Sequence, residues 1–233
     1  GENSQYFRFN DSKLRQSGII EDYAVTISLF SGKKSLQSAT TVSSDIESSV
    51  NNLTNEINAL RNPLSLIPDN EFTSFPDNFD SVEIIKSGQL PDRNEILDAL
   101  MDIITKDYLT GVWTSGKIFR ACSTSEGANH WFEKDSFIFD FSLIDKKENM
   151  VKVLFPGNCW DKSKFNTAFQ EASDKLKLMN KPKKELKPGK YRVWFEPHAV
   201  ADFVDMLNWN GVSESSLRNG SSSLLKMRKD NVN

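Results

Sequence analysis

The first block of the chain carries short strand patterns, the clearest of which alternates between apolar and polar positions as a strand with one buried face does. A short aromatic run, Tyr6-Phe7-Arg8-Phe9, predicts an initial strand. Residues 23–30 place an apolar or aromatic side chain at every second position, which predicts a longer strand. Ser31-Gly32 suits a tight turn, so we expect a hairpin in which residues 34–39 form the partner strand.

After this hairpin the hydrophobic spacing changes from two residues to three or four, which predicts a helix over about 46–60. Ser44 and Glu47 form a capping-box pattern at its start, and Pro63 is expected to end it. Residues 62–91 are rich in Pro, Asn, Asp and Phe and show no period. We therefore expect a long connection that crosses the surface.

The next part of the chain also combines strands and helices. Pro91 is expected to open a second helix, and residues 161–179 predict a third helix with one apolar face. Four strand patterns lie between these helices, at 111–123, about 129–133, 136–144 and 150–155. Short polar or glycine-containing turns separate them, which favours antiparallel neighbours over crossover connections.

A basic segment with prolines, residues 181–190, predicts a linker to a last strand and helix. Residues 191–195 are expected to form the strand, Pro197 to open the helix and Gly211 to end it. Together these patterns predict an α+β fold, an antiparallel sheet with about four flanking helices. We expect both groups of strands to share that one sheet.

Composition and charge narrow the class of protein. The chain has 233 residues, 38% hydrophobic and 26% charged, so it can bury a core of its own. No apolar run reaches the roughly 18 residues of a membrane span, and a formal net charge of -3 is unfavourable for a phosphate-binding surface. We expect no membrane association and no direct contact with nucleic acid. Two cysteines and no signal-peptide pattern favour the cytoplasm.

Motifs for self-contained catalysis are missing from the sequence. Cys122, His130, Cys159 and His198 stand singly, and none has a second His or Cys at metal-ligand spacing. The sequence has no G-x-S-x-G nucleophile elbow and no glycine-rich phosphate loop. The residues alone therefore predict an α+β domain without an active site of its own.

Residues 191–203, followed by Gly211 and the serine-containing segment 221–224, resemble the domain junction of the TldD/PmbA family. In that junction a hydrophobic strand runs into a proline-opened helix and then a loop. The upstream hairpin, helices and strand patterns occur in the order that this family shows. The resemblance implies an N-terminal α+β domain over 1–190 and a strand–helix junction over 191–233. This junction would lead toward a β-rich C-terminal domain absent from this chain.

The family implies a two-subunit cytoplasmic metallopeptidase that processes unfolded or modified peptides. It is also described as a modulator of DNA gyrase and as a factor in peptide maturation. In the TldD-type subunit, the junction helix carries H-E-x-x-x-H, which supplies two metal ligands and a Glu that activates the metal-bound water. The matching stretch here, 205–210, contains neither His nor Glu. The resemblance therefore implies a PmbA/TldE-like subunit without a cofactor of its own, and zinc only in a TldD-type partner.

The role implied for such a subunit is binding. We expect it to contribute surface to the substrate chamber and to the partner, with the peptide substrate held as an added strand through main-chain hydrogen bonds. Asp205, Trp209 and Asn210 lie where the partner carries its metal helix, so they are candidates for facing peptide or partner. Packing of Trp209 on its own helix face is the other interpretation. The alternative function is a stand-alone protein-interaction module of gyrase-modulator type, without a peptidase role.

Overall fold

The computed structural model describes residues 1–75, 80–104 and 108–230. Contacts divide the chain into two compact units, Gly1–Pro182 (unit 1) and Lys183–Asn233 (unit 2). All strands of the described residues belong to unit 1. Within these residues, no helix combines the length and the apolar character that crossing a membrane requires.

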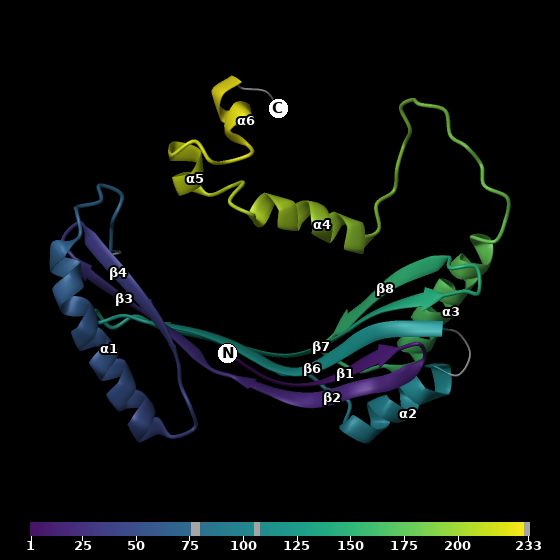
Figure 1. Cartoon of the computed structure of the whole chain (residues 1–233), viewed down its shortest axis with the longest axis horizontal. Helices are drawn as coiled ribbons and strands as arrows, with labels where there is room; N and C mark the ends of the chain where they lie inside the picture. Colours follow the sequence, from purple (N-terminus) through teal and green to yellow (C-terminus); the bar gives the residue numbers. More distant parts are fainter. Residues whose placement is uncertain (76–79, 105–107, 231–233) are drawn as a thin grey trace. The chain divides into compact units, whose positions relative to one another are not determined.

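Six strands of unit 1 form one curved sheet (Figure 1). Their order is β2 (Lys13–Asp22), β1 (Glu2–Asn10), β6 (Tyr108–Ser123), β7 (Asn129–Ile144) and β5 (Val82–Lys86), and β8 (Met150–Gly157) also pairs with β7. Every pairing is antiparallel except that of β5 with β7. The α+β class with a mainly antiparallel sheet and flanking helices, predicted from the sequence, is confirmed.

β7 is a single strand of 16 residues where the sequence predicts two shorter ones. Two polar residues around the expected break have partners. Glu133 forms an ion pair with Lys117 of β6, and Asp135 accepts a hydrogen bond from the backbone N–H of Gly88 at 3.1 Å. The first half of β7 pairs with β5 and the second half with β8, so the strand continues through its charged middle.

β5 lies within residues 62–91, where the sequence predicts a connection without regular structure. That prediction was wrong for 82–86, because β7 supplies backbone partners in parallel register from Val82 opposite His130 to Lys86 opposite Lys134. All five residues of β5 are exposed. The strand therefore lacks the one-sided burial that a pattern of alternating hydrophobic residues reveals.

The other two strands, β3 (Ala24–Ser31) and β4 (Lys34–Thr41), form a separate two-stranded sheet. The predicted hairpin is confirmed, and Gly32 in its turn has a φ of 58°, which glycine adopts without strain. The expectation of one shared sheet was wrong. Helix α1 (Ile46–Leu66) packs on this hairpin and buries Leu60 and Leu64, which makes the pair of strands a small layer of its own.

Both ends of α1 differ from the prediction. Asp45 caps the helix instead of Ser44, because the Asp45 carboxylate accepts a hydrogen bond from the backbone N–H of Ser48 at 3.1 Å. Pro63 does not end the helix, which continues to Leu66. A proline in the last turn removes one backbone hydrogen bond, and burial of the next residue, Leu64, holds that turn in place.

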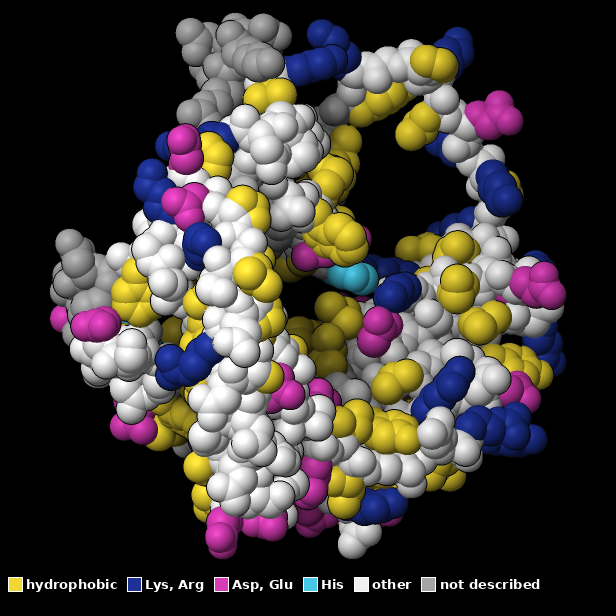
Figure 2. Space-filling view, turned by 60° about the vertical axis from the view of Figure 1, so that its left-hand side comes forward, with side chains coloured by type: hydrophobic (Ala, Val, Ile, Leu, Met, Phe, Trp, Pro, Cys, Tyr) yellow, Lys and Arg dark blue, Asp and Glu magenta, His cyan; other side chains and the backbone are white. Residues whose placement is uncertain are grey.

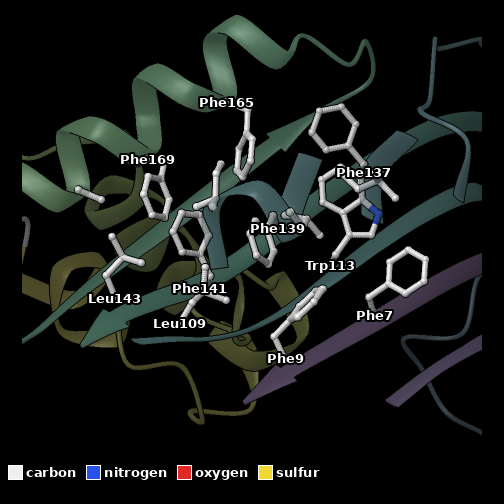
Figure 3. Close-up of a cluster of buried hydrophobic side chains, with 14 of the residues drawn as sticks. Phe7, Phe9, Leu109, Trp113, Phe137, Phe139, Phe141, Leu143, Phe165 and Phe169 are labelled. Atoms are coloured by element: carbon white, nitrogen blue, oxygen red, sulfur yellow. The ribbon is translucent and has the colours of Figure 1, made fainter. Parts of the chain in front are cut away.

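The core of unit 1 lies between one face of the six-stranded sheet and two helices, α2 (Arg93–Ile104) and α3 (Lys162–Leu178). Phe137, Phe139, Phe141 and Leu143 of β7 all point into it, as their alternation predicts. Figure 3 shows the rings of Phe139 and Phe141 between those of α3 and the side chains of β1 and β6. The Phe139 and Phe141 ring centroids are 4.5 Å apart. This aromatic layer covers one face of the sheet, so a binding site on the sheet has to use the other face.

Unit 2 consists of α4 (Pro197–Asn208), α5 (Glu214–Arg218) and α6 (Leu225–Asp230). Helix α4 begins at Pro197, as predicted, and ends at Asn208, before Gly211. Residues 191–195 do not form the predicted strand, because within the described residues no neighbouring strand pairs with them. α4 buries none of its residues, although it carries a pronounced apolar face.

Candidate functional site

The face of the six-stranded sheet opposite the aromatic core contains a hollow of about 690 Å³. Because side chains alternate along a strand, the residues that separate Phe7, Trp113 and Phe139 point to this second face. The sheet hollow, as we name it, is lined by Glu2, Ser4, Ile20, Lys86, Thr114, Ser115, Gly116, Ile118, Lys134, Ser136, Phe137, Ile138, Pro156, Gly157 and Asn158. All of these belong to unit 1, and its volume lies in the range of ligand-binding pockets.

The centre of the sheet hollow is built from small residues on three neighbouring strands. Ser4 of β1, Gly116 of β6 and Ser136 of β7 are direct partners in the registers of these strands. A Cβ atom at Gly116 would lie 2.3 Å from the backbone oxygen of Asn3 and 2.5 Å from the Cα of Ser4, so no other residue fits there. The floor is low because Gly116 has no side chain where β1 and β6 approach each other closely. It is polar because Ser4 and Ser136 lie on either side of this glycine.

Apolar side chains lie among the polar residues of the sheet hollow. Ile138 of β7 lies next to Thr114, and Pro156 of β8 lies next to Ile138. Ile20 and Ile118 also line the hollow. A site that binds an organic ligand combines apolar side chains with polar groups that orient the ligand, and the sheet hollow has both.

Charged residues occupy one row across the sheet hollow. In the strand registers Glu2 lies opposite Ile118, Ile118 opposite Lys134 and Lys134 opposite Lys86. The row therefore has an acidic residue on β1 and two basic residues on β7 and β5. On the described part of the chain neither Lys86 nor Lys134 forms an ion pair.

Other charged residues of the same strands form ion pairs. Lys117 contacts the carboxylate of Glu133, and this hydrogen bond raises the pKa of Lys117 above its usual value of 10.5. At the far end of β7, Lys152 and Asp140 form an ion pair at 3.2 Å. Figure 2 shows Lys and Arg side chains interspersed with Asp and Glu on the surface in view. The unpaired lysines of the sheet hollow thus differ from these paired neighbours.

The three site residues predicted from the sequence lie at the end of α4, in unit 2. Trp209 caps the helix, its backbone N–H bonds to the carbonyl of Asp205 at 3.2 Å, and its side chain is 80% exposed. Asn210 follows with a φ of 62°. The side chains of Asp205 and Asn210 are also exposed. The structure brings them together only as neighbours along one helix end, and their role stays a prediction.

Three of the four single His and Cys residues belong to unit 1. Cys122 of β6 lies opposite His130 of β7, whereas Cys159 follows β8 and His198 belongs to unit 2. Among residues 1–75, 80–104 and 108–230, no group of three or more His, Cys, Asp or Glu side chains could hold a metal ion. The described residues of this chain therefore do not fit a zinc centre.

Sequence reasoning missed the sheet hollow. The available signal was the second set of positions in β6, Val112, Thr114, Gly116 and Ile118, which alternate with buried Trp113 and Ser115. Small polar residues at such positions suit any solvent-facing strand. Only the registers with β1, β7 and β5 show that they join into one depression.

Comparison with known proteins finds similarity among solved structures. No family model and no curated protein matches the chain. Among solved structures it is similar to a crystal structure from Thermotoga maritima named "putative modulator of a DNA gyrase", with a TM-score of 0.68 and 14% sequence identity. The match covers 96% of this chain and 52% of the other, so the chain spans about half the length of that protein. At this identity the similarity establishes the fold.

Proposed function

We propose that this chain is a non-catalytic, PmbA/TldE-like subunit, or a part of one, in a two-subunit metallopeptidase that processes unfolded or modified peptides in the cytoplasm. It would hold the peptide substrate and contact a TldD-type partner, and the partner would supply zinc and the catalytic base. The fold shared with the Thermotoga structure supports the family resemblance of residues 191–203.

The observation that carries this proposal is the sheet hollow. Its floor presents hydroxyls of Ser4, Thr114 and Ser136 beside the apolar side chains of Ile118 and Ile138. Hydroxyls can donate to and accept from peptide groups of any sequence. The apolar side chains of the hollow give side chains of the peptide a surface to contact. Such a site suits unfolded peptides of varied sequence, which is the substrate class that the resemblance implies.

Helix α4 is the surface proposed to contact the partner. Its apolar side chains remain accessible, with Phe203 51%, Met206 62% and neighbouring Trp209 80% exposed. A continuous apolar stripe of this kind marks a protein interface more often than a free surface. Trp is also the residue type that contributes most often to binding energy at such interfaces.

The alternative is a stand-alone interaction module that binds a protein such as gyrase and takes no part in proteolysis. The name of the Thermotoga protein favours it. The two functions differ in one result, because only a peptidase subunit needs a metal-bearing partner for activity.

The test is reconstitution of the complete chain with a TldD-type subunit. Size-exclusion chromatography should show one complex, and hydrolysis of an unstructured fluorogenic peptide should require both subunits and stop with a zinc chelator. Chelator-insensitive hydrolysis by this chain alone would contradict the proposal. Binding to gyrase without any complex with the peptidase subunit would replace it with the alternative.

A further inference from the structure

The charged row across the sheet hollow has a defined length and polarity. Neighbouring strands lie about 4.8 Å apart, so the Cα atoms of Glu2 and Lys134 are separated by about 10 Å and those of Glu2 and Lys86 by about 14 Å. Ile118 stands between Glu2 and Lys134 on β6. Acidic and basic ends are thus held apart by an apolar residue instead of neutralising each other.

The two lysines stand directly opposite each other on β5 and β7. Like charges at opposed positions destabilise a sheet, and the described residues place no carboxylate in an ion pair with either ammonium group. The nearby Asp135 is already engaged, because its carboxylate accepts the hydrogen bond from Gly88. An anion bound between Lys86 and Lys134 would relieve their repulsion.

The carboxylate at the end of a peptide fits this arrangement best. An extended peptide rises about 3.3 Å per residue, so three or four residues span the 10 to 14 Å between the two ends of the row. A short peptide with free ends carries an ammonium group and a carboxylate at that separation. An acidic side chain also supplies a carboxylate. It is not accompanied by an ammonium group at a fixed separation that would reach Glu2.

We propose that the sheet hollow binds short peptides by their free ends, with the C-terminal carboxylate between Lys86 and Lys134 and the N-terminal ammonium group near Glu2. This inference rests on the proposed function and specifies its ligand: peptides of three or four residues, the size of fragments that a peptidase releases. The polar floor of Ser4, Thr114 and Ser136 would contact the peptide groups between the two ends.

The experiment is isothermal titration calorimetry of the complete chain with tetra-alanine, in three forms: free, C-terminally amidated and N-terminally acetylated. We expect amidation to weaken binding at least tenfold and acetylation to weaken it severalfold. The double variant Lys86→Met, Lys134→Met should bind the free peptide at least tenfold more weakly and should no longer distinguish it from the amidated form. Lys152→Met is the matched control, because Lys152 lies on the same face but is paired with Asp140.

Two results would overturn the inference. One is equal affinity for the free and amidated peptides in the unchanged protein. The other is binding of amidated Ala-Glu-Ala-Ala as tight as that of free tetra-alanine, which would assign the lysines to an acidic side chain.

Circular dichroism and thermal unfolding of each variant show whether it is folded, and the comparison of peptide forms on the unchanged protein needs no variant. If the reconstituted complex cleaves peptides while these affinities are equal, this inference fails alone. If end-dependent binding occurs without any peptidase complex, the proposed function fails alone.

Discussion

The indole Nε1 of Trp113 donates a hydrogen bond of 3.1 Å to the hydroxyl of Ser115, and both side chains are buried in the centre of β6. The same hydroxyl accepts a hydrogen bond from the Gln5 side chain at 3.2 Å, which connects β6 to β1. Trp113 also stacks on Phe137 with ring centroids 4.9 Å apart. These contacts anchor the strand that supplies Thr114 and Gly116 to the sheet hollow.

Replacing Ser115 with Ala should therefore destabilise unit 1. The change leaves the buried indole N–H without a partner, which costs about 1–3 kcal/mol in the free energy of unfolding. Urea denaturation followed by tryptophan fluorescence measures this loss. Ser142→Ala in β7 is the control, because the structure shows no hydrogen bond from that hydroxyl within the described residues, and it should change the free energy of unfolding by less than about 0.5 kcal/mol. Equal losses in the two variants would contradict the role of the Trp113 bond.

A second prediction concerns which residue caps the start of α1, Asp45 as in the structure or Ser44 as in the capping-box pattern. Asp45→Ala removes the cap bond to Ser48 and should lower the free energy of unfolding by about 1 kcal/mol. Ser44→Ala should have almost no effect. Thermal unfolding of both variants decides the matter, and a larger loss for Ser44→Ala would restore the capping box that the sequence suggests.

Asp145 begins the turn between β7 and β8, and its carboxylate should make the stability of the fold depend on pH. Its pKa is lowered from 3.8 to about 2, chiefly because the Asn149 side chain donates a hydrogen bond to it at 2.9 Å. Desolvation opposes this shift, and a 2.7 Å bond from Asn180, just after α3, adds to it. Because the pKa is lower in the folded state, Asp145 contributes stability above about pH 4 that is lost as the pH falls toward 2.

Carboxyl ¹³C NMR during an acid titration measures this pKa directly. We expect a midpoint near 2 in the unchanged protein, and Asn149→Ala should move it upward, toward 3.8. Asn180→Ala should move it in the same direction by a smaller amount. A midpoint near 3.8 for Asp145 in the unchanged protein would show that the turn does not hold the carboxylate in this way.

Replacing Trp209 should affect partner binding without affecting folding. The side chain is 80% exposed, so Trp209→Ala should change the free energy of unfolding by less than about 0.5 kcal/mol. As a contact with a TldD-type partner, it should weaken the complex by about 2 kcal/mol, or roughly thirtyfold. Surface plasmon resonance compares it with Leu66→Ala, which removes a side chain 85% exposed on α1. Equal affinities for both variants would remove Trp209 from the interface.

Local signals explain why parts of the fold could be predicted from the sequence. The helix after Asp161 was predicted well, because its cap and its apolar residues from Phe165 to Leu176 act within one segment. The alternation of Phe137 to Leu143 was equally local. β5 and the continuous β7 were missed because their stability comes from pairing with residues far away along the chain.

The candidate site shows the same limit. A serine at position 4, a glycine at 116 and a serine at 136 are unremarkable along the chain, and they meet only when β1, β6 and β7 align in register. The sequence resemblance directed attention to Asp205, Trp209 and Asn210 instead. These three residues are exposed, so they stay candidates for a partner contact. The candidate peptide site in unit 1 could be found only from the registers of the strands.

The central claim is that an unfolded peptide binds in the sheet hollow of this chain. The most direct measurement is a ¹⁵N–¹H NMR titration of the complete labelled chain with an unstructured peptide that has free ends. The account predicts that the largest shifts fall on the amides of Ser4, Thr114, Gly116 and Ser136, while Leu64 inside α1 stays unchanged. Shifts confined to α1 or α4, or no shifts at saturating peptide, would contradict it.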